Sequence, residues 1–381
     1  MFVIDRYLLR QFLQTFLICF LSLTGLYIVL DLFTNMYQFM RCGHKSGNVL
    51  SFIAQYYGYH TILFFNRISG MLTLVSAMFT IAWIQRHNEM TALMAAGVSR
   101  VRVLVPIIVA VAAVSLFSVA NRELVIPRYR NEMSRRPQDP LGDMPQGLSS
   151  RYDYRTDVVL RGKNTFADQM RIEEPNFLLP ATLADYGKQV IADTAFYVPP
   201  QGDRPGGYRF EGVREPKDLD TRPSRSLNGK PVLITPRDAP QWLKPGQCFI
   251  CSDVEFEQLN GDEGAKAFKE LSSTSRLIDS LRNPSLGYGA DVRVAIHLRI
   301  VQPLFDMTLL FLGLPLVVTR ENRNVFLAMG VSMAVSVAFT LTAIGLQTLG
   351  ENEMMEPALA AWAPLMIFVP VAVGLADSLR R

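Results

Sequence analysis

The chain has 381 residues, 49% of them hydrophobic, and its 38 basic and 34 acidic residues leave a formal net charge of +4 at pH 7. A charge this nearly balanced gives no indication of a nucleic-acid partner. The four cysteines do not define a disulfide framework.

Long apolar segments lie towards both ends of the sequence. A helix needs roughly 20 mostly apolar residues to span a bilayer, and five segments meet this length while a sixth is slightly shorter. They are residues 8–33, 61–84, 101–120, 300–318, 325–346 and 358–375. The mean hydropathy is only +0.17 because a long polar insert separates the third segment from the fourth. The sequence therefore predicts an α-helical membrane protein with six transmembrane helices, arranged three plus three around an insert.

The distribution of basic residues predicts the orientation. With the N-terminus in the cytoplasm, nine arginines fall on the inner side, whereas the short outer loops carry only Arg41 and Lys45. The nine are Arg6, Arg10, Arg86, Arg100, Arg102, Arg320, Arg323, Arg380 and Arg381. The positive-inside rule then places both termini in the cytoplasm and the insert outside. The first apolar segment is too long for a signal peptide, so we expect it to remain as an anchor.

The insert, residues 121–293, changes to proline, glycine, charge and alternating apolar residues. Short strand-like pieces lie at 157–160, 189–197, 208–213, 231–235 and 247–256, and a helix is expected at 264–281. Many short strands with turn-rich connections are typical of a sandwich or jelly roll. The predicted domains are therefore 1–120 (helices 1–3), 121–293 (an extracytoplasmic all-β, jellyroll-like domain) and 294–381 (helices 4–6). Phe196 and Phe210 are candidates for an apolar groove that takes acyl chains.

A short polar segment between the second and third spans is the clearest candidate for a docking site. On a helix of about residues 85–97, Glu89, Leu93 and Ala96 share one face, and Gly97 is a natural helix end. Such a helix on the arginine-rich side offers a surface for a cytosolic partner. A solvated charge beside Arg86 is the plainer interpretation of Glu89.

The residue patterns of common enzyme sites are missing from the sequence. Neither Gly162-Lys163 nor Gly229-Lys230 has the upstream glycine of an ATP-binding loop. The four histidines are far apart, and the two cysteines of the C-x-x-C at 248–251 would point to opposite faces of a strand. We therefore expect no enzymatic activity, metal or cofactor, and favour a transport or scaffold role.

Polar and aromatic residues in the first two spans suggest a lipid entrance. Asn35, Arg41, Lys45 and Arg67 are candidates for its polar rim, and Phe12, Phe16, Phe20 and Tyr27 for its apolar wall. Ordinary helix packing or lipid exposure would explain the aromatic stripe equally well.

Ionisable residues inside the spans have more than one interpretation. Asp31 and Arg67 could form a structural ion pair, or Arg67 could contact lipid phosphates. Asp306 in the fourth span is expected to pack towards the bundle.

Several segments, taken in order, resemble the LptF/LptG (YjgP/YjgQ) permeases, the membrane subunits of the lipopolysaccharide-exporting ABC transporter. They are Asp5-Arg-Tyr-Leu8, the run from Glu89 to Ser99, Asn121-Arg-Glu-Leu-Val-Ile-Pro127, Ala192-Asp-Thr-Ala195, the run from Gly207 to Val213, His297-Leu-Arg299, Leu312-Gly-Leu-Pro-Leu316 and Ala361-Trp-Ala-Pro364. One departure is that the lysine cluster of some members is replaced here by Asp31-Leu-Phe-Thr-Asn-Met-Tyr37.

The resemblance implies a multi-pass inner-membrane permease that pairs with a second permease subunit, either a paralogue or a second copy. Two cytosolic ABC ATPase subunits would hydrolyse ATP and dock on its coupling helix, where Glu89 occupies the place of the family's contact acid. Lipopolysaccharide or a related glycolipid would be lifted onto the periplasmic jellyroll and passed to a bridge protein. A membrane scaffold or mechanical transmitter for envelope assembly, which moves no lipid, is the alternative.

Overall fold

The computed structural model describes residues 3–45, 47–135, 144–201, 204–227, 229–259, 261–283, 285–287, 289–318 and 325–377, with residues 137, 139 and 141. The chain divides into a membrane unit (Met1–Tyr37, Ser46–Met133 and Gly289–Arg381) and a β unit (Gln38–Lys45 and Ser134–Tyr288). Four arginines used in the predicted orientation, at positions 320, 323, 380 and 381, lie outside the described residues.

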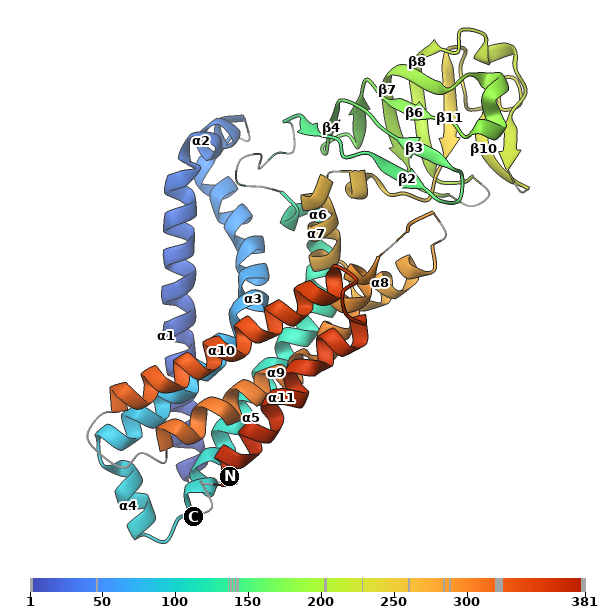
Figure 1. Cartoon of the computed structure of the whole chain (residues 1–381). Helices are drawn as coiled ribbons and strands as arrows, with labels where there is room; N and C mark the ends of the chain where they lie inside the picture. Colours follow the sequence, from blue (N-terminus) through green and yellow to red (C-terminus); the bar gives the residue numbers. More distant parts are fainter. Residues whose placement is uncertain are drawn as a thin grey trace. The chain divides into compact units, whose positions relative to one another are not determined.

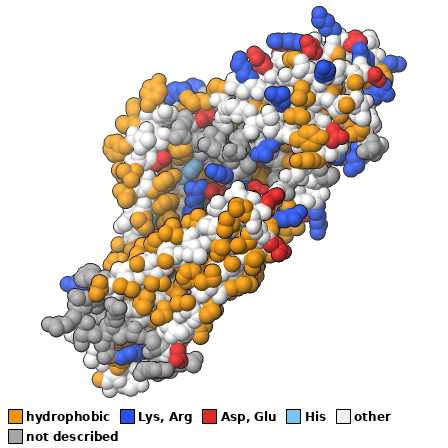
Figure 2. All heavy atoms as spheres, viewed as in Figure 1, with side chains coloured by type: hydrophobic (Ala, Val, Ile, Leu, Met, Phe, Trp, Pro, Cys, Tyr) orange, Lys and Arg blue, Asp and Glu red, His pale blue; other side chains and the backbone are white. Residues whose placement is uncertain are grey.

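Six helices among the described residues are long and apolar enough to cross a membrane, which confirms the predicted number. They are α1 (Val3–Thr34), α3 (Val49–Arg86), α5 (Arg100–Ala120), α9 (Ala290–Val318), α10 (Val325–Glu351) and α11 (Pro357–Asp377). Two short helices interrupt the first three, α2 (Met36–Lys45) and α4 (Glu89–Ala95). Apolar side chains cover the visible surface of the membrane unit, as expected of helices that meet lipid (Figure 2).

The third apolar α-helix, α5, ends at Ala120 as predicted, but helical turns of other kinds follow it. The chain continues through a π-helical turn, η1 (Asn121–Val125), a 3-10 turn, η2 (Ile126–Tyr129), and α6 (Arg130–Met133). Within these turns the Arg122 and Glu123 side chains lie 3.5 Å apart and partly offset each other's charge. By its contacts the β unit begins at Ser134, whereas the insert was predicted from residue 121.

Helices α3 and α9 link the other spans of the membrane unit to one another. Helix α3 contacts α1, α5 and α9, whereas α9 also contacts α5, α10 and α11 (Figure 1). One apolar core joins the first four spans and includes Phe12, Leu74, Ile107 and Leu310. A second core, with Phe305, Phe339 and Leu365, joins α9 to α10 and α11.

The β unit contains an antiparallel sheet of eleven strands among the described residues, which confirms the predicted all-β insert. The strands are β1 (Gln146–Gly147), β2 (Arg151–Asp153), β3 (Val158–Leu160), β4 (Asn164–Phe166), β5 (Arg171–Glu173), β6 (Asn176–Leu178), β7 (Gln189–Val198), β8 (Gly207–Glu215), β9 (Arg225–Leu227), β10 (Lys230–Ile234) and β11 (Gln247–Cys251). One path through the sheet runs β1-β4-β5-β7-β8-β11-β10-β9, while β2, β3 and β6 branch from it.

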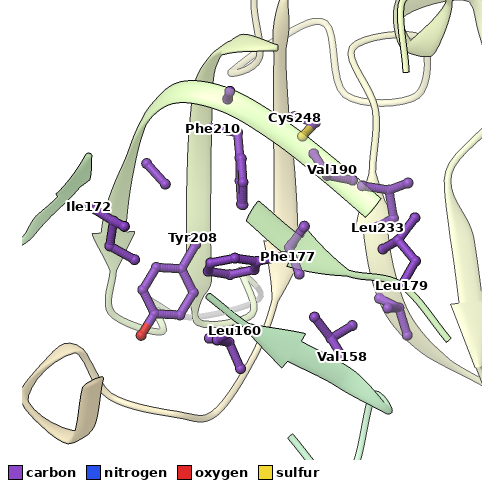
Figure 3. Packing of buried hydrophobic residues seen from close by; sticks show 14 of the residues in the cluster. Val158, Leu160, Ile172, Phe177, Leu179, Val190, Tyr208, Phe210, Leu233 and Cys248 are labelled. Carbon is purple, nitrogen blue, oxygen red and sulfur yellow. The ribbon is translucent and has the colours of Figure 1, made fainter. Parts of the chain in front are cut away.

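Strand β7 joins the two parts of this sheet. Its first residues pair with β6, since Val190 lies opposite Phe177, and its later residues pair with β5, since Ala195 lies opposite Ile172. The sheet therefore folds around one large apolar core, and a smaller apolar cluster packs on the other face of β11. Figure 3 shows Phe177, Tyr208 and Phe210 meeting at the centre of that core.

Two helices follow the last strand, where one was predicted at 264–281. They are α7 (Gly261–Leu271) and α8 (Thr274–Leu281), with the 3-10 turn η5 (Phe256–Leu259) before them. The break has a local cause, because the Ser273 side chain accepts a hydrogen bond from the backbone N–H of Arg276 and so starts a new helix. Two further 3-10 turns, η3 (Ala181–Tyr186) and η4 (Leu219–Thr221), lie between strands.

Candidate functional site

The short helix α4 is held at both ends by backbone geometry (Figure 1). Asn88 precedes it in the left-handed conformation, with φ of 58°. Gly97 follows it with φ of +83°, and Gly97 N–H donates to Met94 O (2.9 Å) while Val98 N–H donates to Leu93 O (3.0 Å). This pair of bonds is a Schellman motif, which satisfies carbonyls that a helix end would leave unpaired. The helix was predicted at about residues 85–97; α4 is shorter because Gln85 and Arg86 belong to α3, and Gly97 follows its end as predicted.

The inner face of α4 packs on the spans. Met90 is buried against Leu8, Ile84 and Val103, and Leu93 packs against the same cluster. Leu93, predicted to share a docking face with Glu89 and Ala96, is half-buried against this cluster, and its docking role stays a prediction. The face that remains exposed carries small residues, namely Thr91, Ala92, Ala95 and Ala96.

Glu89 has an internal partner that the sequence did not reveal. The Tyr7 hydroxyl of α1 donates to its two carboxylate oxygens, at 2.9 and 3.2 Å. Two residues before Tyr7 on α1, Asp5 accepts a hydrogen bond from Arg102 of α5 at 2.8 Å. The start of α1 is thus fastened to both α4 and α5. A docking role for Glu89 stays a prediction.

The predicted lipid-entrance residues divide between the two units. Asn35 is buried and donates to Asp31, whose other carboxylate oxygen accepts from the Tyr57 hydroxyl at 2.8 Å. Arg67 lies exposed on α3. Arg41 and Lys45 belong to the β unit. The entrance stays a prediction.

The aromatic stripe of α1 packs against α3. Phe12 and Phe16 are buried in the membrane core. Phe20 lies edge-to-face with Phe65, with 5.7 Å between ring centroids, and Tyr27 stacks on Phe64 at 4.8 Å. This is the helix packing that the sequence left open as an alternative to a lipid-facing wall.

The two phenylalanines proposed for the jellyroll groove point to opposite faces of the sheet. Phe210 is fully buried in the core, 4.9 Å from the Phe177 ring, and lies opposite Ala195 on the neighbouring strand (Figure 3). Phe196 lies on the other face, beside Arg209. The two side chains therefore cannot line one groove, and only Phe210 faces the domain interior.

A buried polar seam joins α3, α5 and α9 inside the membrane unit. Asp306 is only 3% exposed, accepts from the Ser115 hydroxyl at 2.6 Å, and accepts from the Gln302 amide at 3.2 Å. Gly70 of α3 approaches it so closely that an added Cβ would lie 2.4 Å from Asp306 Oδ1. Asp306 therefore packs towards the bundle, as predicted, but its partners could not be identified from the sequence.

Two arginines and one glutamate lie at the end of this seam. Arg299 is 8% exposed, and Arg122 donates to its backbone carbonyl at 2.9 Å. Glu123 Oε1 lies 3.5 Å from Arg122 Nε and 3.9 Å from Arg299 Nη1. Buried arginines are costly unless paired, so this cluster is a candidate site that sequence reasoning missed. In the sequence, the adjacent charges of Arg122 and Glu123 directly after an apolar segment could have indicated this cluster.

No group of three or more histidine, cysteine or acidic side chains that could hold a metal ion occurs among the described residues. Cys248 and Cys251 are both buried and free, and they pack in different clusters on the two faces of β11. The structure thus agrees with the predicted arrangement of this pair.

Comparison with known families supplies the identification. The chain matches the family described as "Lipopolysaccharide export system permease LptF/LptG" over residues 6–150 and 215–377. A comparison with curated proteins finds no match. The matched residues include all six spans, α4 and the later strands of the β domain, and omit only its strands from β2 to most of β8. Since the match covers most of its length, the chain belongs to the LptF/LptG family, whose members are permeases of the lipopolysaccharide export system.

Proposed function

We propose that this protein is the membrane-spanning half of an ABC transporter that extracts lipopolysaccharide, or a related glycolipid, from the inner membrane. It passes the lipid by way of its periplasmic β domain to a bridge protein. The observation that carries the proposal is α4, a helix locked between two spans with only small side chains on its exposed face. Family membership supports the permease assignment.

In this proposal a cytosolic ABC ATPase dimer docks on α4. Thr91, Ala92, Ala95 and Ala96 are short, so a partner's groove can approach the helix backbone closely. Glu89 lies at the edge of this face and supplies the only negative charge between Gln85 and Val103. The arginine distribution supports a cytoplasmic position for α4 and both termini.

A second permease subunit, a paralogue or a second copy, completes the unit. Helix α1 is the least buried span, with apolar side chains such as Leu17, Leu21 and Phe33 exposed. Covering part of this face with another permease would enclose a lipid path that one six-helix subunit does not enclose alone. Asn35, Arg41, Lys45 and Arg67 are the proposed polar rim of that path.

Affinity purification in mild detergent, with mass spectrometry of bound proteins and lipids, tests the proposal. We expect an ATPase with an ATP-binding loop and an anionic glycolipid to copurify. Recovery of envelope proteins without such an ATPase would instead favour the scaffold alternative.

Variants of Glu89 and Tyr7 test the docking acid separately. Truncating one partner of a buried interfacial charge pair costs about 2 to 5 kcal/mol, so Glu89→Ala should sharply reduce ATPase copurification. Tyr7→Phe removes the internal hydrogen bond but keeps the carboxylate, so copurification should persist. If the two variants lose the ATPase equally, Glu89 acts only through Tyr7; if neither loses it, Glu89 is not a docking residue.

A further inference from the structure

The cytoplasmic ends proposed for α3 and α9 are joined by one side chain. Gln85 Nε2 donates to Val317 O at 3.1 Å and to Val318 O at 3.4 Å, although these residues are more than 230 positions apart in the sequence. The two carbonyls belong to the last described turn of α9. Gln85 therefore ties the end of α3 to a helix that belongs to the other half of the bundle.

Gln85 also lies at the base of α4. It precedes Glu89 by four residues, and the adjacent Ile84 is fully buried in the cluster on which Met90 and Leu93 pack. The last turn of α3 therefore both leads into the proposed coupling helix and carries the side chain that binds the last described turn of α9. No other described residue is seen to hydrogen-bond Gln85 Oε1, which is buried, so the side chain is fixed through its nitrogen alone.

The contact between α3 and α9 continues away from this point. A Cβ added to Gly313 of α9 would lie 2.7 Å from Leu74 Cδ1 of α3, and a Cβ added to Gly70 of α3 would lie 2.4 Å from Asp306 Oδ1 of α9. These close contacts lie at Leu74 and Gly70, whereas at the Gln85 end the described hydrogen bonds between the two helices are those of Gln85 itself. Displacement of the described end of α9 would be passed on to the polar seam through this packing.

We propose that Gln85 is a positioning residue that latches the fourth span to the coupling helix, so that a movement imposed on α4 is transmitted to α9. This inference rests on the proposed function, because it takes an ATPase to be the source of the movement. Without the latch, α4 remains attached to α1, α3 and α5 through the Leu8, Ile84 and Val103 cluster. Docking and ATP hydrolysis then continue while α9 no longer follows.

The identity of the side chain provides the test. Gln85→Glu keeps the length and shape but presents an acceptor and a negative charge to two carbonyl oxygens, so the hydrogen bonds are lost. Gln85→Lys supplies a donor to these oxygens and gives up no hydrogen bond from Oε1. Gln347→Glu is the matched control, since among the described residues Gln347 donates to Glu351 of its own helix α10.

The measurement is ATP-dependent release of lipopolysaccharide from proteoliposomes that contain the complete transporter, recorded with ATP hydrolysis in the same sample. For Gln85→Glu we expect assembly and hydrolysis to be retained, while lipid released per ATP falls about tenfold, within the usual range of coupling effects. Gln85→Lys and Gln347→Glu should release lipid as the wild type does. If Gln85→Glu does not assemble, Gln85→Leu, which also lacks the donor, carries the same expectation.

Normal lipid release per ATP from both donor-less variants would overturn the latch. An equal fall of lipid released per ATP in Gln85→Lys and Gln85→Glu would also overturn the latch. It would show that any substitution at position 85 impairs release, whether or not a donor is present. Absence of ATP-dependent release from the wild-type complex would refute the proposed transport function, and the latch as a transport device with it. The wild-type control therefore separates failure of the transport proposal from failure of the latch alone.

Discussion

Burial determines the chemistry of Cys248 and Cys251 on β11. Both side chains are completely buried. Burial raises the pKa of the Cys251 thiol to about 12 and also raises the pKa of the Cys248 thiol, because the thiolate loses its hydration. When the folded-state pKa of an acid is higher than its unfolded-state pKa, its contribution to stability is fully present below the unfolded-state pKa. This contribution is lost as the pH rises through the folded-state pKa, because the unfolded chain releases the proton first. The β domain should therefore lose stability above about pH 9.

The reactivity of these thiols gives a direct measurement. In full-length protein carrying Cys19→Ala and Cys42→Ala, we expect Ellman's reagent to label Cys248 and Cys251 only after denaturation at about pH 8, because thiolate is the reactive form. Raising the pH to about 9 should accelerate a free-cysteine control strongly and the folded protein little. Rapid stoichiometric labelling of the native protein would contradict the buried placement.

Gly70 illustrates how closely the polar seam is packed. An alanine there would place its Cβ 2.4 Å from Asp306 Oδ1 and 3.3 Å from its Cγ. Gly58 lies in the same helix α3 with nothing within 4 Å of its added Cβ. Comparing alanine substitutions at Gly70 and Gly58 therefore separates steric overpacking from the change in helix propensity.

We expect Gly70→Ala to lower the free energy of unfolding by about 1 to 3 kcal/mol, the usual cost of overpacking. Gly58→Ala should be neutral or stabilising by up to about 1 kcal/mol, since alanine is the better helix former. Thermal unfolding of the two variants in the same detergent provides the comparison. Equal midpoints would show that Gly70 and Asp306 are not in tight contact.

At the scale of the element, α4 depends on a glycine whose φ is positive. Gly97 ends the helix with φ of +83°, a conformation that costs other L-residues about 1 to 2 kcal/mol, and β-branched residues most. Asparagine tolerates it better because its side chain can bond locally. The Schellman bonds from Gly97 and Val98 depend on this geometry.

Gly97→Val should consequently fray α4, and Gly97→Asn should largely preserve it. Hydrogen exchange of the amides of residues 89–95 should accelerate in the valine variant, and ATPase copurification should fall with it. Unchanged exchange in Gly97→Val would show that packing on Leu8 and Val103 suffices to hold the helix.

The sequence predicted elements well where one signal dominated. Apolar length identified all six spans, and five strand-like pieces coincide with β3, β7, β8, β10 and β11. The missed strands, such as β4 and β5, are three residues long, too short for alternation to be recognised. Helix α3 begins twelve residues before its predicted start because its first turns are polar and aromatic, and only the Asn48 cap marks the boundary.

At the scale of the whole molecule, the candidate site shows what composition cannot reveal. The position of α4 and its glycine end follow from local sequence. Three contacts could not be predicted, because each joins residues more than 80 positions apart: Tyr7 with Glu89, Gln85 with Val317, and Ser115 with Asp306. Hydrophobic periodicity does not show which faces of two helices meet. Family membership indicates the fold but does not identify these side-chain contacts.

ATP-driven lipid export is the central claim, and reconstitution tests it most directly. The chain, its partner permease and the copurifying ATPase are placed in proteoliposomes containing lipopolysaccharide, with photo-crosslinkers at position 210, whose phenylalanine faces the β-domain core. We expect lipopolysaccharide to crosslink to the β domain only when ATP is hydrolysed, and Glu89→Ala to abolish the signal. Hydrolysis by the assembled complex with no lipid on the β domain would contradict the account.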